Sequence, residues 1–258
     1  MEERNSLSAR SAVLSALLGS HPPRLPARRL VRIGALFGIA EGTVRVALSR
    51  MVAAGDLIQE HRSYRLSERL VERQARQDES RDPHTRPWDG TWEIAVVTAE
   101  RRAPADRAAF RHTMTALRLA ELREGTWLRP ANLVREWPEA VTAQCTLIDG
   151  RPRRDPTPLL WDLDGWAAQA RRLERALESA LETTLETAME TAMETAPVTA
   201  GGLAEGFLVS AAVLRHLLAD PLLPEELLPP GWPGAELRAR YDAFDARYRE
   251  VLFRHLKD

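Results

Sequence analysis

The chain has 258 residues, enough for one large domain or two to three small ones. Its apolar content of 44% and charged content of 28% are ordinary for a globular protein, and the net charge of −1 argues against a uniformly basic, histone-like coat. The charge is nevertheless uneven. Residues 1–76 hold 13 arginines and 7 acidic residues, whereas residues 161–205 hold 3 arginines and 9 acidic residues. A basic N-terminal third suits contacts with nucleic-acid phosphates.

The cysteine content and the apolar runs set the expected compartment. Cys145 is the only cysteine, so the chain can form neither an intrachain disulfide nor a metal site built on clustered cysteines. The first residues do not have the pattern of a signal peptide. No apolar run approaches the ~20 residues that span a bilayer. We therefore expect a cytoplasmic protein that does not contact a membrane.

The first third of the sequence predicts three helices followed by a β-hairpin. Gly19 and the prolines after it end the first helix, and Gly55 ends the third. The expected helices cover residues 8–18, 26–37 and 41–54, and the expected strands cover residues 57–60 and 64–66. This order is typical of a winged helix-turn-helix, which we assign to residues 1–68. A charged segment, residues 69–87, follows as a helical linker.

The third helix carries the strongest functional signal. Val44, Leu48 and Met51 share one face at helical spacing and are expected to be buried. The opposite face carries short polar groups mixed with guanidinium groups, which suits the major groove of DNA. On this face the candidate DNA contacts are Thr43, Arg45, Val46, Ser49 and Arg50. The two arginines suit guanine and the valine suits a thymine methyl group. The alternative is an ordinary solvated helix face.

Further arginines lie on elements that flank this helix. Arg62 and Arg65 belong to the hairpin, whose tip could enter the minor groove. Arg28 and Arg32 lie on the second helix and could contact the DNA backbone. For each of them the alternative is a charged surface residue. We expect Tyr64 to pack under the hairpin and not against DNA.

The middle of the chain predicts a small α+β domain, residues 88–158. An apolar run with β-branched residues predicts a strand over 92–98, and helical spacing predicts a helix over 105–119. Further strands are expected over 125–128 and 141–148. One strand, one helix and then two strands favour a ferredoxin-like sandwich. The fold class is therefore mixed α and α+β, with several domains.

The remainder, residues 159–258, predicts a helical C-terminal domain. Helices are expected over 203–218 and 237–256, with a proline-rich turn over 220–234. Residues 179–196 contain a near-repeat, Leu-Glu-Thr-Thr, Leu-Glu-Thr-Ala and twice Met-Glu-Thr-Ala. Its period of four drifts about 40° per repeat against a 3.6-residue helix. We interpret this low-complexity insertion as a helical extension or a mobile loop.

The sequence contains none of the common catalytic patterns. The six histidines are scattered without metal-ligand spacing, and no phosphate-binding glycine loop or nucleophile elbow is present. We therefore expect no enzymatic activity, no catalytic residue, no metal and no cofactor.

Three groups of motifs occur in one order along nearly the whole chain. The first is residues 43–55, Thr-Val-Arg-Val-Ala-Leu-Ser-Arg-Met-Val-Ala-Ala-Gly. The second is Trp-Asp-Gly-Thr-Trp at 88–92 with Gly-Thr-Trp-Leu-Arg-Pro at 125–130. The third is Asp-Pro-Leu-Leu-Pro at 220–224 with Gly-Trp-Pro-Gly at 231–234. In these motifs the chain resembles the PaaX family, the repressors of phenylacetate catabolism.

The resemblance implies a homodimeric bacterial repressor with a winged-helix domain, a ferredoxin-like domain akin to the small CRISPR adaptation nuclease, and a helical C-terminal domain. It also implies release from DNA by an acyl-CoA such as phenylacetyl-CoA. We therefore expect a DNA-binding transcriptional regulator of a catabolic operon that binds an inverted repeat in double-stranded DNA. The effector site is not identified. The basic turn at 151–154 and the tryptophans at 127, 137, 161 and 232 are candidates, with a solvated turn and core packing as the alternatives.

Two other functions stay open at this point. The first is a metal-dependent nuclease built on the middle domain, for which Glu100 is the candidate metal ligand. The second is an adaptor whose winged helix binds a protein. A linear loss of binding with the logarithm of salt concentration would favour DNA over a protein partner.

Overall fold

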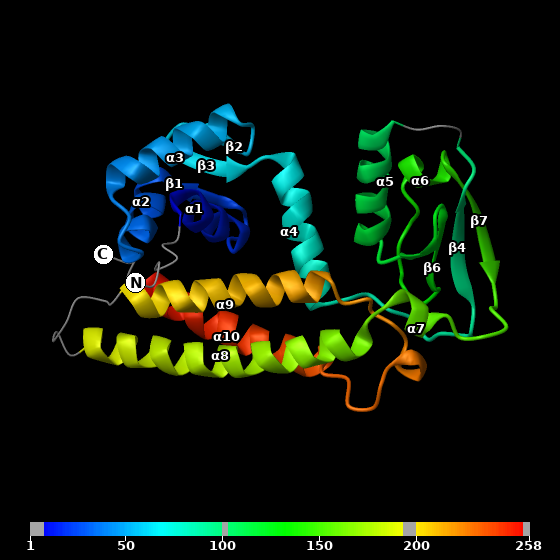
Figure 1. Cartoon of the computed structure of the whole chain (residues 1–258). Helices are drawn as coiled ribbons and strands as arrows, with labels where there is room; N and C mark the ends of the chain where they lie inside the picture. The colour runs from blue at the N-terminus through cyan, green and yellow to red at the C-terminus, as the bar shows by residue number, and fades with distance from the viewer. Residues whose placement is uncertain (1–7, 100–102, 193–199, 255–258) are drawn as a thin grey trace. The chain divides into compact units, whose positions relative to one another are not determined.

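The computed structural model describes residues 8–99, 103–192 and 200–254 (Figure 1). These residues divide between two compact units. The first unit combines residues 1–81 with residues 172–215 and 236–258, and the second combines residues 82–171 with residues 216–235. The chain therefore passes from one unit to the other four times.

The N-terminal part of the first unit contains three helices and a small sheet. The helices are α1 (Ala9–Leu18), α2 (Ala27–Leu36) and α3 (Glu41–Ala53), and the strands are β1 (Arg24–Pro26), β2 (Leu57–Glu60) and β3 (Ser63–Leu66). The sheet is antiparallel in the order β1-β3-β2. Leu17, Leu30 and Leu48, one residue from each helix, belong to the hydrophobic core of this part, and Leu48 was expected to be buried. The three helices and the hairpin were predicted, whereas β1 was not.

The close packing of α2 against α3 depends on a glycine. A Cβ atom built on Gly34 would lie 2.4 Å from Cγ2 of Val44, well inside van der Waals contact. The turn between the helices uses Gly38 with a φ of +70°, which L side chains rarely adopt. These two glycines hold α3 against α2 and thereby fix the side of α3 that remains exposed.

Helix α4 (Glu68–Arg81) follows the hairpin and is packed within the first unit. Leu70 belongs to the N-terminal core, and the Gln74 side chain donates to the carbonyl oxygen of Leu18 over 2.6 Å. At the other end, Arg81 forms an ion pair with Asp242 at 2.6 Å and lies over the Tyr241 ring. The predicted helical linker is thus a helix up to Arg81, with specific partners at both ends.

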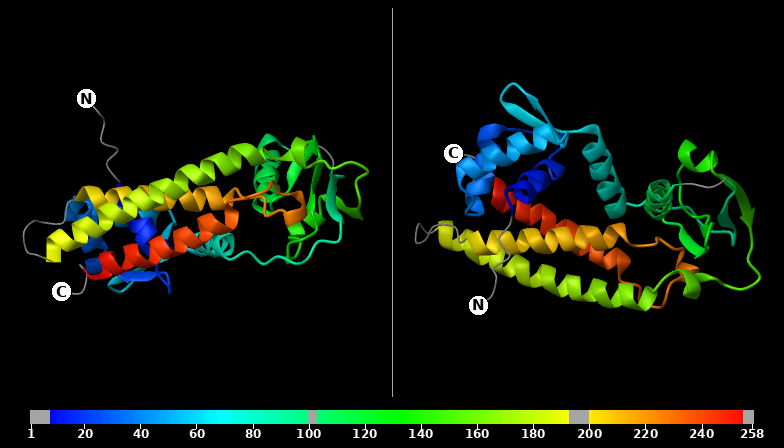
Figure 2. Two further views of the ribbon diagram at one scale, coloured as in Figure 1. Left: turned by 90° about the horizontal axis from the view of Figure 1, so that it is seen from below. Right: turned by 45° about the horizontal axis from the view of Figure 1, so that its top comes forward.

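The remaining helices of the first unit run side by side (Figures 1 and 2). They are α9 (Ala200–Leu218), α10 (Gly234–Arg254) and the part of α8 (Leu163–Ala192) that follows residue 171. The Tyr248 hydroxyl donates to the carbonyl oxygen of Leu203 over 2.8 Å, and the Tyr248 and Phe244 rings stack. None of the helices in the described ranges is long and apolar enough to cross a bilayer.

The low-complexity repeat continues α8. The helix extends without interruption to Ala192, so of the two alternatives the structure has the helical extension over residues 179–192. The end of the repeat, residues 193–196, lies outside the described residues.

The second unit is built on a four-stranded antiparallel sheet. Its elements are β4 (Trp92–Val97), α5 (Pro104–Ala116), β5 (Ala120–Arg123), β6 (Thr126–Pro130), α6 (Glu139–Thr142) and β7 (Cys145–Gly150). The strand order is β5-β6-β4-β7. Phe110 and Met114 of α5 and Val141 of α6 pack with Ala95 and Trp127 of the sheet. This succession of elements and this strand order are those of a ferredoxin-like fold.

The predicted bounds in this unit need two corrections. Residues 120–123 form a strand, β5, that was not predicted, and the helix expected over 105–119 ends at Ala116. The strand expected over 141–148 begins at Cys145, because the Val141 amide donates to the carbonyl oxygen of Pro138 and starts the short helix α6. The unit is completed by α7 (Thr157–Leu160), the start of α8, and the proline-rich segment with a 3-10 turn at Glu225–Leu227.

Candidate nucleic-acid interface

Helix α3 has one buried and one exposed face. Val44, Leu48 and Met51 are buried with at most 2% of their surface exposed. On the other side, all five candidate DNA contacts are exposed to solvent. Val46, although apolar, is 50% exposed. The exposed candidates are Thr43, Arg45, Val46, Ser49 and Arg50. An apolar side chain held at the surface between polar ones can contact a ligand without unfolding the helix.

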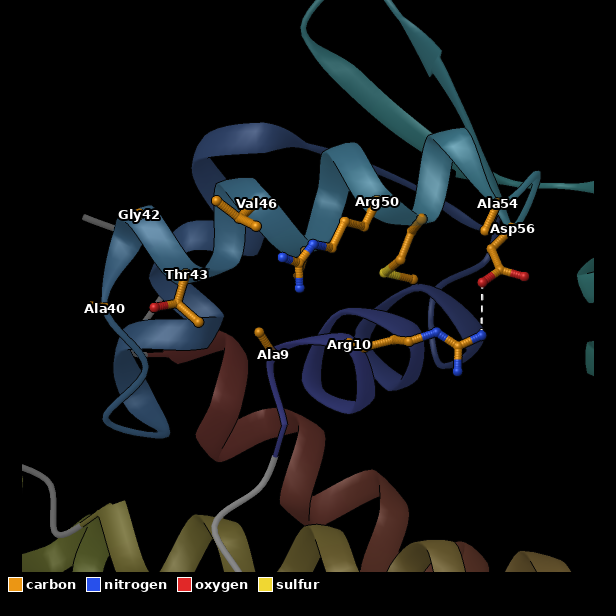
Figure 3. A pocket seen from close by; sticks show the side chains of 11 residues that line it. Ala9, Arg10, Ala40, Gly42, Thr43, Val46, Arg50, Ala54 and Asp56 are labelled. Carbon is orange, nitrogen blue, oxygen red and sulfur yellow. Dashed lines mark hydrogen bonds and ion pairs between the residues drawn. The ribbon is translucent and has the colours of Figure 1, made fainter.

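A groove runs along this side of α3 and separates it from the first turn of α1 (Figure 3). Its volume is about 820 Å³. Thr43, Val46 and Arg50 line it from α3, and Ala9 and Arg10 line it from α1. Figure 3 shows the Val46 and Arg50 side chains pointing into the space between the two helices. Part of the candidate DNA-binding face is therefore a concave surface and not a flat one.

The two arginines of α3 are in different electrostatic situations. Arg45 forms an ion pair with Glu41 one turn earlier, with 2.6 Å between Nη2 and Oε1. Both side chains are more than half exposed, so the pair is screened by water and exchanges easily. Among the residues that the structure describes, Arg50 has no ion-pair partner. Arg50 is therefore the guanidinium of α3 that is available to a ligand without breaking a contact.

Asp56 anchors two arginines near the end of α3. The Asp56 side chain is 4% exposed and accepts from Arg10 of α1 at 2.7 Å and from Arg69 of α4 at 2.5 Å. Its backbone amide donates to the carbonyl oxygen of Met51 over 2.9 Å, which fixes the residue to the last turn of α3. Sequence reasoning missed these three residues. The aspartate after a helix-ending glycine was visible, but its partners lie 46 and 13 positions away.

The hairpin places its arginines differently from one another. Arg62 lies exposed at the tip, where His61 has a φ of +55°. Arg65 donates to Glu60 across the hairpin over 2.5 Å, and Arg24 of β1 approaches the same carboxylate at 3.4 Å. The hydrogen bond from Arg65 lowers the pKa of Glu60. Of the two hairpin arginines predicted to contact DNA, Arg62 is exposed, whereas Arg65 is bound by the Glu60 carboxylate of the same hairpin. Tyr64 packs against the core, as expected.

The two candidate arginines on α2 also differ in exposure. Arg28 is exposed, and Arg32 is half-buried. They lie one turn apart on the same side of the helix. The structure therefore leaves Arg28 as the more accessible of the two.

The second unit contains a contrasting, buried arginine. Arg129 of β6 is fully buried and lies opposite Glu93 in the register of β4 and β6. Its Nη2 atom donates to Asn132 over 2.7 Å and to the carbonyl oxygen of Leu222 over 3.3 Å. Burial, together with the nearby Arg135 guanidinium, lowers the pKa of Arg129 to about 9.

The same segment of chain is held by two further side chains. Asn132 donates to the carbonyl oxygen of Leu222 over 3.0 Å, and Arg118 donates to the carbonyl oxygens of Leu218 and Asp220. Leu222 has a φ of +51°, an unfavourable conformation for a leucine that these contacts help to maintain. The Asp-Pro-Leu-Leu-Pro motif is therefore a clamped segment of the second unit.

Each tryptophan that was a candidate for the effector site packs against a different partner in the second unit. Trp127 belongs to the sheet core, Trp161 stacks on Trp92, and Trp232 stacks on Trp166. The Arg135 guanidinium lies over the Trp137 ring, with 4.3 Å between the guanidinium carbon Cζ and the ring centroid. The rings therefore have packing roles in the structure. The turn at 151–154 is largely exposed.

The groups required for a metal-dependent nuclease are not brought together in the described residues. No three histidine, cysteine, aspartate or glutamate side chains gather there in a way that could hold a metal ion. Glu100, the candidate ligand, lies outside the described residues.

Comparisons with known proteins cover most of the chain. Residues 8–70 match the model of the PaaX-like protein, residues 85–147 match the PaaX protein central Cas2-like domain, and residues 161–258 match the PaaX-like protein C-terminal domain. Among solved structures, the chain is similar to the uncharacterized protein Rv0674 from Mycobacterium tuberculosis. The identity is 42% and the TM-score is 0.73, over 97% of this chain and 100% of that one. No curated protein matches the chain significantly.

Proposed function

Because the chain belongs to the PaaX family, a family of transcriptional regulators, we propose that it is a DNA-binding transcriptional repressor whose winged helix is formed by α1 to α3 and the β2–β3 hairpin. The observation that carries this proposal is the exposed face of α3. It holds Thr43, Val46 and Arg50 in the open while the opposite face is fixed in the core. A regulator family and an absence of enzymatic activity fit each other.

In the proposed complex, α3 lies in the major groove. Arg50 donates to O6 and N7 of a guanine, and Val46 packs on a thymine methyl group. Arg45 must exchange its ion pair with Glu41 for a contact with DNA, which costs little because the pair is exposed. Thr43 and Ser49 bind phosphates or base edges.

The flanking elements extend this interface. Arg62 reaches the minor groove from the hairpin tip, and Arg28 contacts the backbone from α2. Arg65 and Arg32 support the same surfaces at the edge of the interface. Residues 1–68 would form the DNA-binding domain, with α4 as the helix that connects it to the middle domain at 88–158 and the C-terminal domain at 159–258.

The proposal includes a homodimer that binds an inverted repeat. Two copies of α3 related by a two-fold axis would contact half-sites about 34–36 Å apart, or a multiple of that spacing. A small-molecule effector, of the acyl-CoA class that the family suggests, would release the protein by favouring a dimer whose helices no longer match this spacing.

Equilibrium binding to DNA tests this function. The protein is titrated against fluorescent duplexes from its own promoter region and against a scrambled duplex, over a series of salt concentrations. We expect specific binding with a linear fall of log affinity against log salt, and a loss of at least tenfold in specific affinity for Arg50→Ala. Arg111→Ala, a change to an exposed arginine of the second unit, is the matched control. Salt-independent binding, or wild-type affinity of Arg50→Ala, would contradict the proposal.

A further inference from the structure

The two arginines held by Asp56 are both ordered and exposed. Arg10 comes from α1 and Arg69 from α4, yet both guanidinium groups meet on one carboxylate. The carboxylate is 4% exposed, whereas the arginine side chains are 60% and 67% exposed. A structural ion pair needs one cation. A buried carboxylate that holds two cations at the surface leaves an excess of positive charge there.

These arginines also keep most of their hydrogen-bonding capacity. A guanidinium has five N–H donors, and each of these two arginines uses Nη2 on Asp56. The remaining donors can form bidentate bonds with a phosphate. Because Asp56 fixes the two guanidinium groups in place, less side-chain entropy is lost when they bind.

The ion pair between Arg10 and Asp56 adjoins the proposed DNA-binding face. Arg10 and Asp56 line the same groove as Thr43, Val46 and Arg50 (Figure 3). Figure 3 shows Arg10 joined to Asp56 at one end of the groove, with Arg50 pointing into the space between them and Thr43. Arg10, Arg50 and Arg69 outnumber Asp56, which gives this set of residues a net charge of +2.

The shape of the groove favours a backbone over a compact anion. Small residues, Ala9, Ala40, Gly42 and Ala47, form much of its wall and leave room for a chain to approach closely. Arg10 lines it and Arg69 shares the Asp56 carboxylate beside it; both arginine side chains are more than half exposed. A continuous strand of sugar and phosphate can contact both arginines because its charges are spaced along it.

We propose that the end of the groove formed by Arg10 and Asp56 lies against the sugar-phosphate backbone of the DNA that flanks the bases read by α3, with Arg10 and the neighbouring Arg69 as phosphate contacts. Asp56 is a positioning residue that holds both. This inference rests on the proposed DNA-binding function and extends the interface from α3 to α1 and α4. The contact is independent of base sequence, so it serves affinity and register and not base discrimination.

The test compares Arg10→Gln, Arg69→Gln and Arg111→Gln in binding titrations with a specific and a scrambled duplex over a range of salt. We expect the first two variants to lose affinity for both duplexes by a similar factor, about three- to tenfold at moderate salt. Each should also reduce the slope of log affinity against log salt by about one. Arg111→Gln, which removes an exposed arginine paired with Glu121 in the second unit, should match the wild type.

Asp56→Asn separates positioning from net charge. It removes a negative charge from a DNA-binding face, so charge alone predicts tighter binding to both duplexes. The proposal predicts weaker binding, because both guanidinium groups lose their anchor. A thermal melt of the same variant shows whether the domain is still folded, and the two arginine variants test the contact without this change to a buried residue.

Three outcomes would overturn the inference. If Arg10→Gln and Arg69→Gln bind both duplexes like the wild type while Arg50→Ala does not, the groove is not used and the proposed function stands. If Arg50→Ala also binds like the wild type, the proposed function fails with it. If inorganic phosphate binds saturably in the absence of DNA, and the arginine variants abolish that binding without affecting DNA, the site belongs to a small anion.

Discussion

Arginine has opposite roles in the two units. In the first unit, Arg10 and Arg50 line a groove, and Arg69 is an exposed side chain that shares the Asp56 carboxylate with Arg10. In the second unit, Arg129 is fully buried and its donors are directed at Asn132 and at the backbone of the proline-rich segment. The same side chain is thus exposed and available to a ligand in one unit, and buried in internal hydrogen bonds in the other.

The largest expected effect is on the foundation of the exposed face. Leu48 is 1% exposed in the N-terminal core, so Leu48→Asp buries a carboxylate without a partner and should unfold this domain, at a cost of several kcal/mol. Leu48→Met keeps the volume and should lower stability by less than about 1.5 kcal/mol. Circular dichroism during thermal unfolding measures both. A cooperative melt of Leu48→Asp near the wild-type temperature would mean that the opposite face of α3 is the buried one.

Arg129→Ala attacks the buried side of the comparison. It removes a fully buried side chain and leaves Asn132 and the carbonyl of Leu222 with fewer partners, so we expect a loss of roughly 3 kcal/mol or more. Arg111→Ala, at an exposed site, should change stability by about 1 kcal/mol or less. Denaturant titration of both variants checks the difference. Equal, small losses would mean that Arg129 does not clamp the proline-rich segment.

At alkaline pH, Tyr241 of the first unit and Arg129 of the second unit are expected to change the free energy of unfolding in opposite directions. Burial raises the pKa of Tyr241 in the first unit to about 12, above its ordinary value of 10. The unfolded chain therefore loses this proton first, and the stabilisation that is complete below pH 10 falls as the pH rises to 12, by about 2–3 kcal/mol. For Arg129 the folded pKa is the lower one, so its contribution to stability rises with pH above 9.

Tyr241→Phe isolates the first of these effects. The variant loses the hydrogen bond with Ser210 but should show a weaker fall in stability between pH 10 and 12 than the wild type. Denaturant titrations at several pH values measure it. Parallel pH profiles of the two proteins would show that Tyr241 does not titrate in this range.

The smallest expected effect concerns Glu41. Glu41→Gln breaks the ion pair with Arg45 and should change stability by only about 0.3–0.5 kcal/mol, as is usual for an exposed pair one turn apart. It also removes a negative charge from the proposed interface, so DNA binding should be unchanged or a few times tighter. Weaker DNA binding with unchanged stability would mean that Glu41 orients Arg45 for its contact.

The elements that could be predicted from the sequence are those with a clear local pattern of apolar residues. The spacing of Val44, Leu48 and Met51 identified the buried side of α3, and an apolar run with β-branched residues located β4. Strand β1 was missed because it has three residues and ends in a proline, and β5 was missed because Ala-Glu-Leu-Arg consists of good helix formers. The strand predicted to begin at Val141 begins at Cys145 in the structure, because Val141 belongs to the short helix α6.

Contacts between distant residues could not be predicted in the same way. Nothing in the local pattern joins Arg10 or Arg69 to Asp56, or Arg65 to Glu60, since each pairing depends on how the elements are packed. Arg129 departs from the rule that arginine stays at the surface. The motif around it was recognisable, but its burial follows from the segment at Leu222 that covers it.

Sequence-specific binding requires that Arg50 reads a base from the exposed face of α3. The most direct measurement is equilibrium binding of the wild type and of Arg50→Ala to operator duplexes in which single guanines are replaced by 7-deazaguanine, which lacks N7. We predict that one replacement in each half-site weakens wild-type binding by about tenfold and has no further effect on Arg50→Ala. If no guanine position distinguishes the two proteins, Arg50 does not read a base through this face, and the central claim is contradicted.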